Sequence, residues 1–160
     1  MCGIIGVLDR SKQTTLDQVR AMSTCLQHRG PDDEGVFSDS HKGVYLAHRR
    51  LSLIDLSPAG HQPMETDDFA ISYNGEIYNF SEIRQELEAL GIEFASTSDT
   101  EVLLKAWQEW GKEVVHKCRG MFAFVLYDKK QNKLYVYRDR LGVKPLYYYC
   151  DQERFVCASE

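Results

Sequence analysis

The sequence contains no apolar run long enough to cross a bilayer, which takes about 20 consecutive apolar residues. The first apolar stretch ends at Asp9 and Arg10, which is too early for a secretory signal peptide. There is no excess of positive charge either, because the net charge is −5. Neither a nucleic acid nor an anionic membrane surface is therefore expected as a partner, and the expected location is the cytoplasm.

Metal-binding and disulfide patterns are also missing. The five histidines show no H-x-x-x-H spacing, and the odd number of cysteines shows no C-x-x-C spacing. We therefore expect no metal and no complete disulfide framework. The cysteines after Cys2 are expected to be small core residues, and these are Cys25, Cys118, Cys150 and Cys157.

What is present fits one globular domain of 160 residues with 43% hydrophobic and 27% charged residues, and without repeats or linkers. Apolar patterns predict helices over residues 14–28, from about 81 to 91, and from a capping box at Ser98–Glu101 to about Gly111. Strands are predicted over residues 3–8, 34–38, 43–49, 69–73, 121–127, 134–137, 146–150 and 155–158. Residues 52–68 form a long irregular segment of the kind that is usually functional or mobile. Helices grouped between sets of strands predict an α+β layered fold.

The start of the chain, MCGIIG, offers a specific chemistry. If Met1 is removed, Cys2 carries both a thiol and a free α-amino group. The thiol can act as the nucleophile and the amine as its base, because an α-amino group titrates near about 8. The alternative is that the chain begins Met-Cys by chance.

Asn74 and Gly75 follow the predicted strand 69–73. Asn-Gly is a common turn, but an asparagine amide and the next backbone N–H can also form an oxyanion hole, where glycine would let a substrate approach. Arg50, at the end of another strand, is either a solvated charge or a two-point clamp for a carboxylate.

Two acidic residues stand near these positions, Glu76 and Asp99. Asp99 lies at a helix start, where a negative charge is favourable in any case; the functional alternative is that both bind a cationic amine. His48 is not chosen as a base, because a lone strand histidine is more often packed. The charged loop 138–146 is either a solvated turn or a partner-contacting loop. A nucleophile, an oxyanion hole, a carboxylate clamp and an amine-binding acid together suit an amino acid with a side-chain amide, such as glutamine.

At this point the chain resembles a known family, the glutaminase domain of glutamine-using asparagine synthetases, within the N-terminal-nucleophile (class II) amidotransferases. The matching motifs occur in order along nearly the whole chain: MCGIIG at 1–6, HRGPDDEG at 28–35, AHRRLSLIDLSPAGHQPM at 47–64, YNGEIYN at 73–79, SDTE at 98–101, GMFAFVLYD at 120–128 and RDRLGVKPLYY at 138–148.

The resemblance implies a four-layer αββα sandwich and a role for each site residue. Cys2 would be the nucleophile, and Asn74 and Gly75 the oxyanion hole. Arg50 would hold the glutamine α-carboxylate beside backbone groups of Leu51, Ser52, Leu53 and Ile54. Glu76 and Asp99 would bind the substrate, chiefly its amine.

The implied reaction is hydrolysis of glutamine to glutamate and ammonia through a Cys2 thioester, without a cofactor in this chain. In the family the ammonia passes to a synthetase domain of the same protein, which uses ATP and Mg²⁺ to convert aspartate into asparagine. We expect residues 1–160 to be that glutaminase domain, shortened at its C-terminal end and without the synthetase domain. The resemblance leaves the oligomeric state open, with a homodimer as one candidate.

Two alternatives remain open. A domain of the same fold could supply ammonia to another acceptor, as in a peptide-modifying or secondary-metabolite pathway. The chain could also be a non-catalytic module that binds glutamine or a partner, which retention of Met1 would favour.

Overall fold

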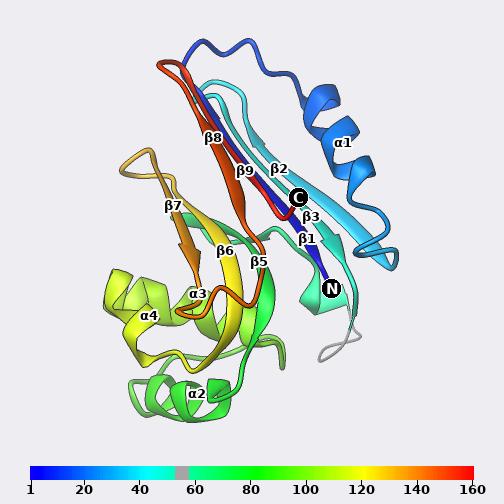
Figure 1. Cartoon of the computed structure of the whole chain (residues 1–160). Coiled ribbons are helices and arrows are strands. Elements are labelled where there is room, and N and C mark those ends of the chain that lie inside the picture. The colour runs from blue at the N-terminus through cyan, green and yellow to red at the C-terminus, as the bar shows by residue number, and fades with distance from the viewer. Residues whose placement is uncertain (53–57) are drawn as a thin grey trace.

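The computed structural model describes residues 1–52 and 58–160, and these form two antiparallel sheets with helices on their outer faces (Figure 1). Sheet A has the strand order β2 (Asp33–Asp39), β3 (Val44–Arg50), β1 (Gly3–Asp9), β9 (Arg154–Ala158), β8 (Tyr147–Cys150). Sheet B has the order β4 (Met64–Glu65), β5 (Phe69–Ile77), β6 (Gly120–Asp128), β7 (Lys133–Arg138). The helices are α1 (Leu16–Cys25), α2 (Phe80–Ala89), α3 (Asp99–Trp110) and α4 (Val114–Lys117), with 3-10 turns η1 (Pro58–Gly60) and η2 (Gly111–Glu113).

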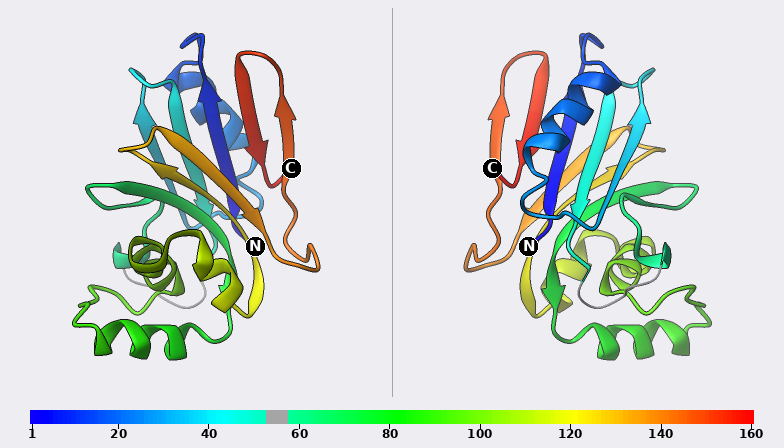
Figure 2. Two further views of the ribbon diagram at one scale, coloured as in Figure 1. Left: turned by 90° about the vertical axis from the view of Figure 1, so that its left-hand side faces the viewer. Right: turned by 90° about the vertical axis from the view of Figure 1, so that its right-hand side faces the viewer.

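Three apolar clusters separate four layers. The side views in Figure 2 show the helices on the outer faces of the two sheets. One cluster lies between α1 and sheet A, a second lies between the two sheets, and the third lies between sheet B and helices α2 to α4. The expected α+β fold and its αββα layering are therefore confirmed. None of the helices among the described residues is long and apolar enough to span a membrane.

Strand β1 shows how the sequence produces these layers. Ile4 packs between the sheets, whereas Ile5 and Val7 pack under α1, as the alternation of side chains along a strand requires. At Gly6 an added Cβ would lie 2.6 Å from the Val125 side chain, so glycine allows the sheets to approach closely. Cys2 has the same parity as Ile4 and Gly6, which directs its side chain toward sheet B.

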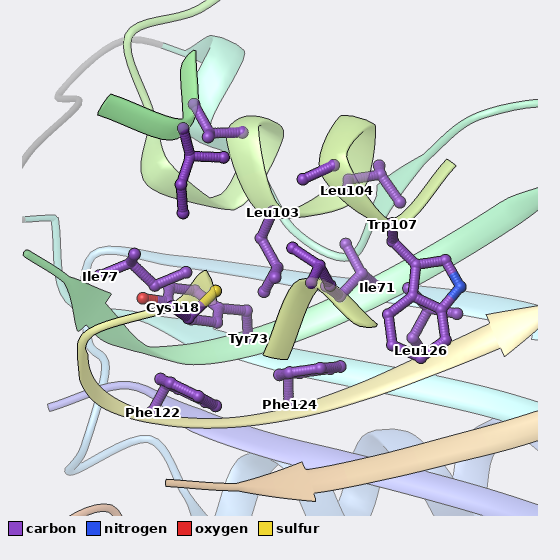
Figure 3. Close-up of a cluster of buried hydrophobic side chains, with 14 of the residues drawn as sticks. Ile71, Tyr73, Ile77, Leu103, Leu104, Trp107, Cys118, Phe122, Phe124 and Leu126 are labelled. Atoms are coloured by element: carbon purple, nitrogen blue, oxygen red, sulfur yellow. The ribbon is translucent and has the colours of Figure 1, made fainter. Parts of the chain in front are cut away.

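The cluster under α2 to α4 is rich in aromatic rings (Figure 3). Phe124 is fully buried, and its ring lies 5.2 Å from that of Tyr137 and 6.1 Å from that of Trp107. The cluster also fixes α3, since Leu103 and Trp107 are both buried in it. This packing matters for the site because α3 begins with Asp99.

Threonine and serine cap the N-termini of α1 and α3, but the capping box predicted at Ser98–Glu101 is only half formed. Thr15 caps α1 and forms a full capping box with Gln18. Ser98 caps α3 by accepting from the Glu101 N–H, as predicted. The Glu101 carboxylate, however, accepts the N–H groups of Ala95 and Ser96. Glu101 thus braces the loop before the helix.

Several predicted boundaries were wrong. Strand β5 continues to Ile77, because β6 pairs with it as far as Gly120, so the Asn74-Gly75 pair lies inside a strand and forms no turn. Helix α1 ends at Cys25, short of His28, because residues 26–30 continue in three-residue turns. Strand β4 lies within the segment predicted to be irregular, and α4 was not predicted.

The prediction that four cysteines are core residues was right for only two of them. Cys118 and Cys157 are buried, whereas Cys25 and Cys150 are exposed. Cys25 is the last residue of α1, whose buried residues are Val19 and Ser23. Cys150 ends the edge strand β8, all four residues of which are exposed.

The aromatic cluster generates a stability prediction. Phe124→Ala removes a fully buried ring and should lower the free energy of unfolding by about 3–5 kcal/mol, measured by urea denaturation. Tyr147→Ala is the matched control, because Tyr147 is 65% exposed, and it should change stability by less than about 0.5 kcal/mol. Equal losses in the two variants would contradict this account of the core.

Candidate active site

A pocket of about 230 Å³ opens where the start of β1, the end of β3, the middle of β5 and the start of α3 meet. Its lining residues are Met1, Cys2, Arg50, Leu51, Gly60, Gln62, Tyr73, Asn74, Gly75, Glu76, Ser98, Asp99, Thr100 and Lys144. Seven residues predicted from the sequence are in this set: Cys2, Arg50, Leu51, Asn74, Gly75, Glu76 and Asp99. Ser52 is not in the lining, and its N–H donates to the Asp32 carboxylate at 2.8 Å. Leu53 and Ile54 lie outside the described residues.

The backbone of Leu51 positions the Cys2 thiol. The Leu51 N–H donates to the Cys2 Sγ at 3.4 Å, and the Sγ lies 3.7 Å from the Leu51 carbonyl oxygen. Burial raises the pKa of the Cys2 thiol, while the Leu51 N–H, the chain's N-terminal charge, Arg50 and Lys144 act in the opposite direction. The net effect is a thiol that stays protonated at neutral pH, so it needs a base before it can attack.

Asn74 presents a donor without a partner. The residue is 2% exposed, and its Nδ2 has no hydrogen-bond partner among the described residues. A buried amide without a partner is costly, so such a group suits a ligand that accepts its hydrogen bond. Strand alternation places the Asn74 side chain on the face of β5 that looks toward sheet A, the same face from which Ser72 donates to the Ala47 carbonyl oxygen.

The N–H of Gly75 is directed away from β6. Gly75 faces Phe122 across the ladder, but the N–H and C=O of Phe122 both bond to Asp139 on the far side. The pair therefore exchanges no hydrogen bonds, as alternate pairs in an antiparallel ladder do. Two residues along β5 in each direction, the Tyr73 N–H donates to Gln62 at 2.7 Å and the Ile77 N–H donates to Asp99 at 3.1 Å, both away from β6. Gly75 lies between them and shares this direction, which is toward the pocket.

The requirement for glycine at position 75 comes from the neighbouring strand. An added Cβ would lie 2.5 Å from the Met121 carbonyl oxygen and 2.7 Å from the Phe122 Cα. We expected glycine here to let a substrate approach, and this stays a prediction. The structure shows that glycine at this position also makes room for β6.

Asp99 is tied to strand β5 by two hydrogen bonds. Its Oδ2 accepts from the Tyr73 hydroxyl at 2.6 Å and from the Ile77 N–H at 3.1 Å. Burial raises the pKa of Asp99, and the nearby charge of Glu76 acts in the same direction, whereas the two hydrogen bonds oppose it. The pKa of Tyr73 lies well above its usual value because of burial and the adjacent carboxylate. Tyr73 therefore keeps its proton and donates a hydrogen bond to Asp99.

Gln62 and Lys144 were missed as individual site residues. Gln62 is 6% exposed and links two sides of the pocket, because it accepts from Tyr73 N and donates to the Thr100 hydroxyl at 3.2 Å. Lys144 is 7% exposed. Both lie in motifs noted in the sequence, GHQPM and RDRLGVKPLYY, but a glutamine in an irregular segment and a lysine in a charged loop carry no signal of burial.

Arg50, which was predicted to bind the substrate, and His48, which was not chosen as a base, lie in different surroundings. Arg50 is 8% exposed at the end of β3, opposite Asp33 of β2, and it lines the pocket. His48 is 1% exposed, does not line the pocket, and points its Nδ1 at Ser72. Burial lowers the pKa of His48 to about 3, so it is neutral and packed, in agreement with its exclusion as a base.

Comparison with known proteins identifies the family. The sequence profile of the glutamine amidotransferase domain matches residues 1–160, and the chain belongs to this family. Glutamine-hydrolysing asparagine synthetases 1 and 3 of Bacillus subtilis are 44% and 43% identical to it. Each alignment covers 100% of this chain and 26% of the relative, so the chain spans about a quarter of their length and corresponds to their N-terminal part.

The chain is also similar to a protein with a different name and to a solved structure. The amidase chry2 of Gibberella zeae is 37% identical over 96% of this chain and 23% of its own length. Among solved structures, glutamine phosphoribosylpyrophosphate amidotransferase from B. subtilis has a TM-score of 0.75 over 99% of this chain and 42% of its own, at 22% identity. At that identity the likeness shows the shared fold alone.

The setting of the thiol generates a prediction on its pH dependence. Because burial raises the pKa of Cys2 above its ordinary value of 9.0, its alkylation by iodoacetamide should reach half of its maximal rate at a pH above 9. A short peptide of sequence MCGIIG is the control and should reach half of its maximal rate near pH 9. Peptide mass spectrometry separates Cys2 from Cys118 and Cys157, whose pKa values burial raises to about 12. A Cys2 profile identical to that of the peptide would contradict the burial effect.

Proposed function

We propose that this pocket hydrolyses the side-chain amide of glutamine, with Cys2 as the nucleophile. The observation that carries the proposal is the meeting, in one pocket of about 230 Å³, of a thiol and an unpartnered Asn74 amide. A nucleophile beside donors without partners is the arrangement that an acyl-transfer site requires.

The pocket also offers a place for each end of the substrate. Arg50 would hold the α-carboxylate in a two-point hydrogen-bonded pair, with backbone groups of residues 51–54 beside it. Asp99 and Glu76 would bind the α-ammonium group. Since the carboxylate of Asp99 is already oriented by Tyr73 and Ile77, it would be held ready for a cation. A substrate cation would also relieve the cost of burying this carboxylate.

Hydrolysis of the Met1–Cys2 peptide bond, which takes place once, would prepare the chain for catalysis by freeing the α-amine of Cys2. The amine accepts the thiol proton, directly or through a water molecule, and the sulfur attacks the amide carbon of glutamine. Asn74 Nδ2 and the Gly75 N–H donate to the oxyanion of the tetrahedral intermediate. The proton passes to the leaving nitrogen, ammonia departs, and water hydrolyses the γ-glutamyl thioester to glutamate. Every group in this sequence belongs to the chain, so no cofactor is needed here.

The relatives support a larger setting for the reaction. In a protein like the B. subtilis asparagine synthetases, the ammonia would pass to a synthetase domain that uses ATP and Mg²⁺ to convert aspartate into asparagine. A cytoplasmic location and a homodimer belong to this same proposal. The second candidate is a glutaminase that supplies another acceptor, and the 37% identity to an amidase favours keeping it. Sequencing the gene beyond codon 160 distinguishes the two.

Substitutions at the two central residues test the activity. Cys2→Ala should abolish release of glutamate and ammonia from glutamine, because no nucleophile remains. Asn74→Ala should lower kcat by about 100- to 1,000-fold with a smaller change in KM, because it removes a donor used mainly in the transition state. Glutamate dehydrogenase-coupled assays measure both. The proposal fails if Cys2→Ala turns over glutamine at the wild-type rate.

Processing of the N-terminus is tested separately. Intact mass spectrometry of the purified chain should show the loss of one methionine residue, since the mechanism requires a free amine on Cys2. An N-terminal extension that blocks removal of Met1 should abolish hydrolysis and leave the unfolding curve unchanged. A fully active chain that retains Met1 would rule out the amine as the base and leave the thiol role open.

A further inference from the structure

We propose that Lys144 is a positioning residue for the nucleophile, and that its ammonium group stabilises the thiolate of Cys2. This inference rests on the proposed function of Cys2, and it concerns a residue from the opposite end of the sequence. Cys2 precedes β1, whereas Lys144 lies in the loop between β7 and β8, and both line the same pocket.

The loop that carries Lys144 is held by the carboxylate of Asp139, which is 6% exposed. Its Oδ1 accepts the N–H groups of Leu141 at 3.1 Å and Val143 at 3.0 Å, and its Oδ2 accepts those of Lys144 at 3.0 Å and Phe122 at 3.3 Å. These four hydrogen bonds to one carboxylate fix the loop to β6. They also lower the pKa of Asp139, so it remains charged.

Arg138 holds the same loop from its other side. Its Nε donates to the Lys144 carbonyl oxygen at 2.7 Å, and one terminal nitrogen donates to the Gly142 carbonyl oxygen at 2.6 Å. Both backbone groups of Lys144 are therefore bonded, the N–H to Asp139 and the C=O to Arg138. The side chain of Lys144 thus leaves the loop from a fixed point.

In this loop the apolar side chains are exposed and the lysine is mostly buried, whereas surface loops usually show the opposite. Leu141 is 90% exposed and Val143 is 53% exposed, whereas Lys144 is 7% exposed. Lys144 thus lies mostly within the protein, where it lines the pocket. Among the described residues, no carboxylate lies within ion-pair distance of the Lys144 ammonium. A thiolate at Cys2 would place a negative charge in the same pocket as this ammonium.

Other charged groups around the thiol act together with Lys144. The Leu51 N–H, the N-terminal amine of Met1 and Arg50 at the end of β3 also favour the thiolate. The charge of Lys144 lowers the pKa of the thiol in the same direction. Glu76 of β5 and Asp99 of α3 line the same pocket and are acidic, and Tyr73 is held neutral by its high pKa. Arg29 donates its Nε to the Cys2 carbonyl oxygen at 3.0 Å. Among these positively charged groups, we expect Lys144 to stabilise the thiolate of Cys2 by its charge, without a hydrogen bond that holds the backbone of Cys2.

The test measures the reactivity of the thiol in the absence of glutamine. Iodoacetamide is neutral, so its rate of reaction with Cys2 across pH 6.5 to 10 follows the thiolate fraction. Lys144→Met should move this profile upward by about half a pH unit to one unit, which makes alkylation about three- to ten-fold slower at pH 7.5. Lys144→Arg should stay within about two-fold of the wild-type rate, because it keeps the charge.

Controls separate the charge effect from damage to the fold. Lys133→Met removes an exposed lysine and should leave the Cys2 profile unchanged. Lys144→Gln keeps a polar side chain, serves as the second neutral variant if Lys144→Met unfolds, and should give the same upward shift. Thermal unfolding of each variant checks that the fold is intact. A folded neutral variant with the wild-type profile overturns the inference, as does a Lys144→Arg profile shifted as far as that of the neutral variants.

This readout is independent of the proposed function. If the wild-type chain does not hydrolyse glutamine but Lys144→Met shifts the alkylation profile, the glutaminase proposal fails and the role of Lys144 stands. If glutamine is hydrolysed and the profile does not shift, the role of Lys144 fails alone. A change confined to KM for glutamine, with an unchanged alkylation profile, would place Lys144 at the substrate carboxylate and also overturn the inference.

Discussion

The close approach of β6 to β5 at Gly75 is the contact on which the pocket depends. It requires the absence of a side chain, because a Cβ at Gly75 would collide with the backbone of Met121 and Phe122. This approach keeps Asn74 and Gly75 within a continuous ladder, where their donors have fixed directions. Donors held in a strand need no reorganisation energy when charge develops nearby, in contrast to donors in a flexible turn. The neighbouring N–H groups of Tyr73 and Ile77 donate to Gln62 and Asp99. On this side of β5, the donors left for a ligand are therefore those of Asn74 and Gly75, which line the pocket.

Two opposing effects set the state of the nucleophile. Burial shields Cys2 and favours the neutral thiol, while surrounding cations and the Leu51 N–H favour the thiolate. The balance leaves the resting chain with a protonated and therefore less reactive sulfur. A nucleophile of this kind is protected from unwanted alkylation or oxidation and becomes reactive when a base is next to it.

The apolar run that contains Ile4, Ile5 and Val7 predicted a buried strand, and the grouping of helices and strands predicted an α+β fold, but the four-layer arrangement came from the family resemblance. Seven of the fourteen residues that line the pocket were predicted, and Cys2 among them was distinctive because of its position. The resemblance also supplied roles that spacing alone could not. What the sequence could not show was long-range: the pairing of Gly75 with Phe122 lies 47 positions apart, and the burial of Lys144 depends on hydrogen bonds to Asp139 that no local pattern reports.

Strand β8 has a further consequence for the behaviour of the chain in solution. It forms one edge of sheet A, and Tyr147, Tyr148 and Tyr149 are each more than half exposed along it. A strand edge offers a row of backbone donors and acceptors to any extended segment that lies beside it. Exposed aromatic rings add apolar surface that such a segment can bury. Other chains of residues 1–160 could therefore pair with this edge and aggregate at high concentration. Neighbouring protein that covers the edge, or a lysine or proline placed on β8, would prevent this pairing.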